Sequence, residues 1–268
     1  MSFIHPTAVI SAGAIIGEGS SVGPYSVIGP EVVLGRNNRV GSHVVIEGIT
    51  RIGDDNQIYQ FASVGAAPQD LKYHGERSEL RIGNKNLIRE YVTLQPGTSG
   101  GRMATDIGDG NLFMACSHVG HDGVIGNGNV IANSVALAGH VEIGNYVTLG
   151  GLTGIHQFVR IGDYALLGAG SMVPLDIPPY CVAQGDRAGL TGINQIGLER
   201  RGYGAADVSA IKELFRSLFV AKGLFKEKLQ SCQEQFSSNK AAKVFLDFVT
   251  SSKRGVTPLR SKDAGRRE

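Results

Sequence analysis

The chain has 268 residues with 26 lysines and arginines against 24 acids, and its net charge of +2 gives no general attraction to nucleic acid. Its 38 glycines far exceed ordinary usage but do not recur every third residue, which excludes collagen. Three scattered cysteines, no signal-peptide pattern and no run of about 18 apolar residues predict a cytoplasmic protein without a transmembrane segment.

An aliphatic residue recurs at every sixth position through most of the chain. The series is unbroken over residues 4–64, returns over 82–94 and resumes one residue out of phase over 107–173. Of these 26 positions only Phe113 is not aliphatic, and glycine follows directly in 15 of them. The repeat is too long and too regular to be a chance pattern.

A period of six fits neither the 3.6 residues of a helical turn nor the alternation of a hairpin sheet. It fits a coil of three short strands, in which the aliphatic side chain points inward and the glycine lets the backbone bend at the corner. Eighteen residues then complete one coil, and coils stack at about 4.8 Å through parallel ladders. The repeat therefore predicts an all-β triangular prism.

We expect this prism over residues 1–186. Acids occupy two inner positions, Asp70 and Glu76, so loops are expected to protrude at 66–81 and, in a glycine-rich stretch, at 95–106. Loops on a rigid scaffold often carry function, although a plain insertion explains the second loop equally well.

Residues 187–268 are expected to form a connector, a small α-helical C-terminal domain and a basic tail. Apolar side chains with helical spacing occupy 208–219, and two further helices are expected near 224–236 and 240–249. The tail from Ser251 carries six lysines and arginines against two acids and is expected to be frayed.

Counting in coils of eighteen places three histidines on one outer edge of the prism. His121, His140 and His156 each follow an inner aliphatic residue of successive coils by three residues or fewer. His121 is expected about 5 Å along the axis from His140 and about 10 Å from His156. Because aliphatics fill the interior, a substrate pocket must form outside, where this edge meets something else, and a neighbouring subunit is the obvious candidate.

Three other interpretations of these histidines remain open. They could form a polar ladder that serves only solubility. The chain could also be a non-enzymatic scaffold, which has no need of adjacent His121 and Asp122. They could also bind zinc, as in the γ-type carbonic anhydrases that share this kind of repeat, although every ligand nitrogen then has to lie about 2.0–2.1 Å from the ion.

Six motifs together resemble the UDP-N-acetylglucosamine O-acyltransferases of lipid A biosynthesis, within the hexapeptide-repeat acyltransferases. In chain order they are PQDLKY, SHVGHDG, LAGHVEIG, TGIHQFVRIG, DIPPYCVAQGDRA and GLERRGY. The resemblance implies a left-handed parallel β-helix, a homotrimer, and transfer of a (3-hydroxy)acyl chain from acyl carrier protein to the 3-position of the sugar nucleotide. The related N-acyltransferases carry an extra N-terminal domain, whereas here the hexads begin at Ile4.

The resemblance also implies roles for individual residues. A sugar hydroxyl is a weak nucleophile, so a base must take its proton; His121 matches that base, with Asp122 to orient it and the Gly139 N–H to bind the oxyanion. Ile196 stands where relatives carry a glutamate. The implied substrate-binding positions are Gln69, Asp70, Lys72, His118, His140, His156, Gln157, Asn194, Arg200 and Arg201, and the implied acyl-length position is Ala169.

No cofactor and no metal ion are implied, because phosphopantetheine enters as part of acyl carrier protein. That carrier is acidic, so a basic docking surface is expected on the C-terminal side. Lys212, Arg216 and Lys222 are the candidates for it, together with the pair Arg200 and Arg201.

Overall fold

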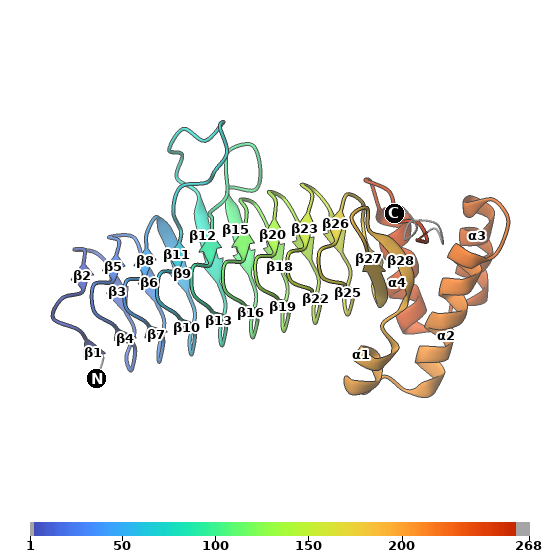
Figure 1. The fold of residues 1–268 in the computed structure, drawn as a ribbon, viewed down its shortest axis with the longest axis horizontal. Coiled ribbons are helices and arrows are strands. Elements are labelled where there is room, and N and C mark those ends of the chain that lie inside the picture. The colour runs from blue at the N-terminus through green and yellow to red at the C-terminus, as the bar shows by residue number, and fades with distance from the viewer. Residues whose placement is uncertain (1–2, 261–268) are drawn as a thin grey trace, which may run out of the picture.

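The computed structural model describes residues 3–260, and the molecule is a long triangular prism with helices at one end (Figure 1). Three sheets form the faces of the prism, and we number them in the order in which the chain first enters them. The first sheet contains β1 (Phe3–Ile4), β4 (Ser21–Val22), β7 (Arg39–Val40), β10 (Gln57–Ile58), β13 (Leu87–Ile88), β16 (Leu112–Phe113), β19 (Val130–Ile131), β22 (Thr148–Leu149), β25 (Leu166–Leu167), β27 (Cys181–Gln184) and β28 (Gly189–Ile193).

The second and third sheets follow in the same rotation around the prism. The second contains β2 (Val9–Ile10), β5 (Val27–Ile28), β8 (Val45–Ile46), β11 (Ser63–Val64), β14 (Thr93–Leu94), β17 (His118–Val119), β20 (Ala136–Leu137), β23 (Gly154–Ile155) and β26 (Met172–Val173). The third contains β3 (Ile15–Ile16), β6 (Val33–Leu34), β9 (Ile49–Ile52), β12 (Glu79–Ile82), β15 (Ala104–Ile107), β18 (Val124–Ile125), β21 (Glu142–Ile143) and β24 (Arg160–Ile161).

The register of these sheets is the eighteen-residue register that the hexads predict. Val119 pairs with Leu137, and Leu137 pairs with Ile155, all through parallel ladders. The inner side chains from Val22 onward are buried, whereas Ile4 in the first described coil is 42% exposed. The predicted left-handed parallel β-helix with a helical C-terminus is thus confirmed.

The glycines that follow the inner aliphatics act differently from our expectation. A Cβ on Gly17 would lie 2.3 Å from the Gly35 carbonyl oxygen of the next coil, and neither glycine has a positive φ. These glycines therefore allow adjacent coils to stack closely. The positive φ of the corner falls three residues after the inner aliphatic, mostly on non-glycine residues such as Tyr25, Asp122 and His140.

Two loops leave the prism and return in register (Figure 1). Ile82 pairs with Ile52 and Ile107 pairs with Ile82, so both loops rejoin the same inner column of the third sheet. The returning strands begin at Glu79 and Ala104, a few residues earlier than expected. Burial explains the earlier return, because each strand inserts one more side chain, Leu80 or Thr105, into the interior.

The prism ends in an antiparallel hairpin of β27 and β28, and helices follow it. They are α1 (Gln195–Arg200), α2 (Ala205–Phe215), a π-helical segment (Arg216–Val220), α3 (Phe225–Gln235) and α4 (Lys240–Ser251). Their apolar faces share a core that includes Leu198, Ile211, Leu214, Leu218 and Phe245. Within residues 3–260 no helix is long and apolar enough to cross a membrane.

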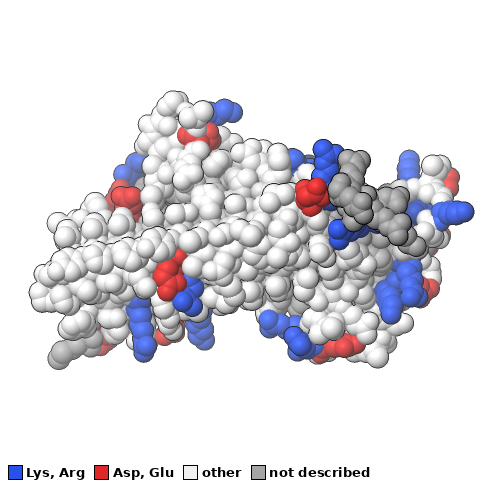
Figure 2. Space-filling view, viewed as in Figure 1, with Lys and Arg blue, Asp and Glu red and all other residues white. Residues whose placement is uncertain are grey.

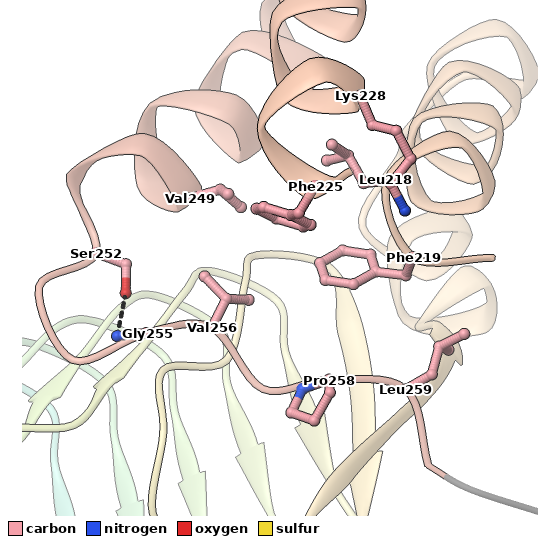
Figure 3. Close-up of a pocket in the computed structure, with 10 residues that line it drawn as sticks. All are labelled: Leu218, Phe219, Phe225, Lys228, Val249, Ser252, Gly255, Val256, Pro258 and Leu259. Carbon is pink, nitrogen blue, oxygen red and sulfur yellow. Dashed lines mark hydrogen bonds between the residues drawn. The ribbon is translucent and has the colours of Figure 1, made fainter. Parts of the chain in front are cut away.

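The expectation of a frayed tail is wrong for residues 252–260. Val256 forms a β-bridge with Asp176, Leu259 forms one with Leu190, and Thr257 is fully buried. The segment packs beneath the helices and lines an apolar pocket of about 460 Å³ with Phe219 and other side chains (Figure 3). Burial of its apolar side chains holds it against the prism. The remainder of the basic tail, 261–268, lies outside the described residues.

Candidate active site

Three corners between the second and third sheets form the edge where the histidines meet, which we call the histidine edge (residues 120–123, 138–141 and 156–159). The ring centroids of His121 and His140 are 5.0 Å apart, and those of His140 and Phe158 are 4.4 Å apart. His156 and Gln157 also lie on this edge. The parallel register alone brings these side chains together, although they are far apart in sequence.

His121 and Asp122 form a buried hydrogen-bonded pair. The Asp122 Oδ2 atom lies 2.9 Å from His121 Nδ1. Asp122 is 2% exposed and His121 is 7% exposed. An ionised carboxylate only accepts hydrogen bonds, so neutral His121 carries its proton on Nδ1 and its lone pair on Nε2. The pair has the arrangement of a general base and the group that orients it.

The Asp122 carboxylate receives further hydrogen bonds from the second loop. Its oxygens lie 2.7 Å from Thr98 Oγ1, 3.1 Å from the Thr98 amide and 2.7 Å from the Arg102 amide. Burial opposes ionisation of this carboxyl, but the bonds from Thr98, His121 and Arg102 outweigh burial and lower the pKa of Asp122. Asp122 is therefore ionised at neutral pH.

Two groups flank the free Nε2 atom of His121. The Oδ2 atom of Asp70, from the first loop, lies 3.9 Å from it. On the other side Gly139 approaches so closely that a Cβ there would lie 2.5 Å from Nε2. In the described structure the backbone N–H of Gly139 donates to no carbonyl of the neighbouring coils, so it is free to donate.

The remaining histidines near the pair have different partners. Burial, followed by the neighbouring His121 charge, lowers the pKa of His118, whose Nδ1 atom is 2.7 Å from Thr93 Oγ1. Burial also lowers the pKa of His140, against the opposing effect of the Asp122 charge. Both rings are thus neutral at pH 7 and can donate or accept hydrogen bonds. His156 Nδ1 lies 2.8 Å from an Arg254 guanidinium nitrogen.

The zinc interpretation takes His121, His140 and His156 as candidate ligands, with ligands from a second subunit to compensate for the distance to His156. Among residues 3–260, the ligand atoms that gather within 4.8 Å of one another belong instead to His121, Asp122 and His140. The Asp122 oxygens already accept hydrogen bonds from the second loop and from His121 Nδ1. The Nδ1 atom of His156 is already paired with a guanidinium nitrogen of Arg254. This geometry is better suited to proton transfer than to a tetrahedral metal site.

The other candidate residues occupy several parts of the chain. Gln69, Asp70 and Lys72 lie on the first loop, and of these Asp70 comes within 3.9 Å of His121 on the histidine edge. Ala169 lies at a corner between the first and second sheets. A single chain therefore does not bring Ala169 to the histidine edge.

The region expected to bind the nucleotide lies at the edge between the third and first sheets. The Arg201 guanidinium is 4.3 Å from the centroid of the Tyr146 ring at that edge, and Arg200 ends helix α1 beside it. Asn194 caps α1 by accepting from the Gly197 amide, and it donates to the Tyr164 carbonyl oxygen. Its amide thus already has structural partners on both sides.

Three residues of the site were not predicted from the sequence. Thr98 and Arg102 come from the glycine-rich loop, where nothing in the sequence indicates that the backbone folds onto Asp122. Phe158 could have been found, because it lies eighteen residues after His140 and thus in the same column of the prism. Counting in coils finds partners within the prism but not partners on its loops.

Comparisons with known proteins agree across nearly the whole chain. A family model described as UDP-N-acetylglucosamine O-acyltransferase, domain 2, matches residues 176–257, and one described as bacterial transferase hexapeptide (six repeats) matches 13–48. The acyl-[acyl-carrier-protein]–UDP-N-acetylglucosamine O-acyltransferase of Myxococcus xanthus is 50% identical over 257 residues, which are 96% of this chain and 100% of the relative.

Another relative and a solved structure show the same similarity. The enzyme of that name from a Sulfurovum species is 48% identical over 256 residues, which are 96% of this chain and 98% of the relative. The crystal structure of UDP-N-acetylglucosamine O-acyltransferase from Moraxella catarrhalis matches with a TM-score of 0.92 at 41% identity. That match covers 95% of this chain and 99% of the other.

Proposed function

Because the chain belongs to the UDP-N-acetylglucosamine O-acyltransferase family, we propose that it moves an acyl chain from acyl carrier protein to the 3-hydroxyl of UDP-N-acetylglucosamine. This transfer is the first step of lipid A biosynthesis. The observation that supports the chemistry is the buried His121–Asp122 pair, with its free Nε2 atom on an outer edge.

In this mechanism His121 Nε2 takes the proton of the sugar hydroxyl while the hydroxyl oxygen attacks the thioester carbonyl. The carbonyl oxygen becomes an oxyanion, and the free N–H of Gly139 beside the imidazole is suited to donate to it. When the tetrahedral intermediate collapses, the phosphopantetheine sulfur leaves and His121 returns the proton to it. The step needs no covalent enzyme intermediate and no bound cofactor.

Replacement of Gly139 by alanine is expected to lower kcat by about 10²-fold, because the added methyl forces the His121 ring away from its position. Steady-state rates with purified acyl carrier protein measure the effect. Gly204→Ala is the matched control, since a Cβ at Gly204 meets nothing within 4 Å. Equal rates for the two variants would remove Gly139 from the mechanism.

We propose further that a homotrimer completes the site. In one chain the histidine edge, the Arg200–Arg201 region and Ala169 lie on three different edges of the prism. Packing three prisms around a threefold axis brings different edges of neighbouring copies together. Arginine pairs suit phosphate oxygens, so the Arg200–Arg201 edge of a second copy fits the diphosphate of the sugar nucleotide. Ala169 is then placed to limit the acyl chain.

The charge distribution supports docking of the carrier at the helical end. Residues 195–268 contain 15 lysines and arginines against 8 acids, whereas residues 1–194 contain 11 against 16. Many of the Lys and Arg side chains in Figure 2 lie over this end of the molecule. Lys212, Arg216 and Lys222 are all exposed there and suit an acidic partner.

Reversing the charges of Lys212 and Arg216 to glutamate is expected to raise KM for the acyl donor at low salt, with kcat little changed. Added salt should reduce the difference from the wild type, because it screens exposed charges beyond about 10 Å at 0.1 M. Arg39→Glu, an exposed position on β7 in the prism, is the control. A donor KM that does not change at low salt would place docking elsewhere.

Product analysis tests the proposed reaction directly. The purified protein is incubated with a mixture of acyl carrier proteins that bear different chains, and with either UDP-N-acetylglucosamine or its 3-amino analogue. Mass spectrometry then identifies the acylated sugar nucleotide and the preferred chain. A protein that acylates neither acceptor does not have this activity.

A further inference from the structure

The second loop, residues 95–103, contacts Asp122 more extensively than His121 does. The Thr98 hydroxyl and the Thr98 and Arg102 amides supply three of the four groups that donate to the carboxylate, and the fourth is His121 Nδ1. Thr98 Oγ1 and His121 Nδ1 donate to the same oxygen, Oδ2, while the Arg102 amide donates to Oδ1. Thr98 itself is only 2% exposed. The loop thus determines where the carboxylate lies.

The loop backbone is held in the conformation that these contacts require. The Gly101 and Met103 amides both donate to the Thr98 carbonyl oxygen, and the Gly97 amide donates to that of Glu79. A Cβ on Gly101 would lie 2.2 Å from the Asp122 carboxyl carbon, so only glycine allows this approach. The glycine-rich sequence therefore serves close contact with Asp122.

The second loop is also joined to the first. The Glu76 carboxylate accepts from the Ser99 amide at 2.8 Å and from the His74 amide at 2.8 Å. These backbone hydrogen bonds are the main reason that the pKa of Glu76 is lowered to about 2, so the bridge stays charged at physiological pH. The first loop carries Asp70, which lies 3.9 Å from His121 Nε2. The first loop therefore faces the Nε2 end of the imidazole directly, and the second loop acts on the Nδ1 end through Asp122.

We propose that Thr98 is a positioning residue of the reaction: its hydroxyl fixes the Asp122 carboxylate so that His121 keeps its proton on Nδ1 and presents Nε2 to the sugar hydroxyl. This inference rests on the proposed function, in which His121 is the base. Hydrogen bonds to a charged group are stronger than those between neutral groups, and at 2% exposure the Asp122 carboxylate is poorly placed to replace a lost donor from bulk solvent. The second loop is accordingly part of the catalytic machinery.

The test replaces Thr98 by valine, which has the same shape but no hydroxyl. We expect kcat to fall about ten- to a hundredfold while KM for the sugar nucleotide stays within about twofold. Loss of a donor also raises the pKa of Asp122, so the acid limb of the kcat profile should move to higher pH. Thr98→Ser, which keeps the hydroxyl, should restore both kcat and the profile.

Thr105→Val is the matched control, because the Thr105 hydroxyl is buried without a hydrogen-bond partner in the described structure. It should leave kcat and the pH profile unchanged. The proposal is overturned if Thr98→Val keeps the wild-type kcat and profile, if its only effect is on KM, or if Thr98→Ser is as slow as Thr98→Val. If His121→Ala itself retains activity, His121 is not the base and the positioning role of Thr98 fails with it. A wild-type protein that acylates neither acceptor ends the proposed function instead, and the two failures are thus distinguishable.

Discussion

Replacement of His121 by alanine is expected to lower the rate of acyl transfer by about 10²- to 10⁴-fold, the contribution typical of a positioned general base. The imidazole is the group beside Gly139 that has a free nitrogen to take the hydroxyl proton. The rate is measured with purified acyl-loaded carrier protein and UDP-N-acetylglucosamine, with the product detected by mass spectrometry. Near-normal turnover would exclude His121 as the base.

The fold should tolerate this change, because stability comes from the inner aliphatic columns and His121 lies on an outer edge. An unchanged melting temperature and an unchanged oligomeric state check this point. His43→Ala is the matched control: His43 lies at a corner between the first and second sheets, in a stack with Tyr25 and Phe61. It should retain full activity.

Replacement of Asp122 by asparagine is expected to lower kcat by about 10²- to 10⁴-fold, as loss of the orienting carboxylate does in other histidine-dependent enzymes. Four hydrogen-bond donors converge on the carboxylate, whereas an amide offers one oxygen and adds a donor. If the amide nitrogen faces His121, Nδ1 must become the acceptor and the proton moves to Nε2. With a proton on Nε2, His121 can no longer accept the proton of the sugar hydroxyl.

Asp163→Asn is the control for this substitution. Asp163 accepts from Asn145 in an outer ladder where Asn145 itself, one coil earlier, accepts from Asn127 in the same way. Asparagine is thus already compatible with that position, and full activity is expected. Wild-type kcat in Asp122→Asn, with the rate assay and melting curves measured side by side, would show that the carboxylate is not needed.

The prism could be predicted from the sequence because one physical constraint repeats in every coil. Each hexad must bury one side chain, so the positions of the three sheets and of the inner columns follow from counting. The same counting places His121 and His140 on one edge, where their rings lie 5.0 Å apart. The handedness did not follow from the repeat and depended on the family resemblance.

Features outside the repeat could not be predicted in the same way. The contacts of Thr98 and Arg102 with Asp122 depend on how an irregular loop folds back, and no periodic pattern records that. The ordered segment 252–260 was missed because its charge suggested a solvated tail, whereas its apolar side chains, Val256 and Leu259 among them, pack against the rest of the protein. The positions of the corner glycines were predicted, but glycine is needed there because it lets adjacent coils stack closely, and not because it lets the backbone bend.

Both loops leave the prism after a strand of the second sheet and enter the third sheet in register, which separates two kinds of evolutionary change in this protein. Ile52, Ile82 and Ile107 stay on adjacent rungs whatever length of chain intervenes. Insertions or deletions at these two points can therefore reshape the surroundings of the imidazole without any compensating mutation in the interior. The two loops can thus change in length while the prism continues to place the histidines at a constant spacing.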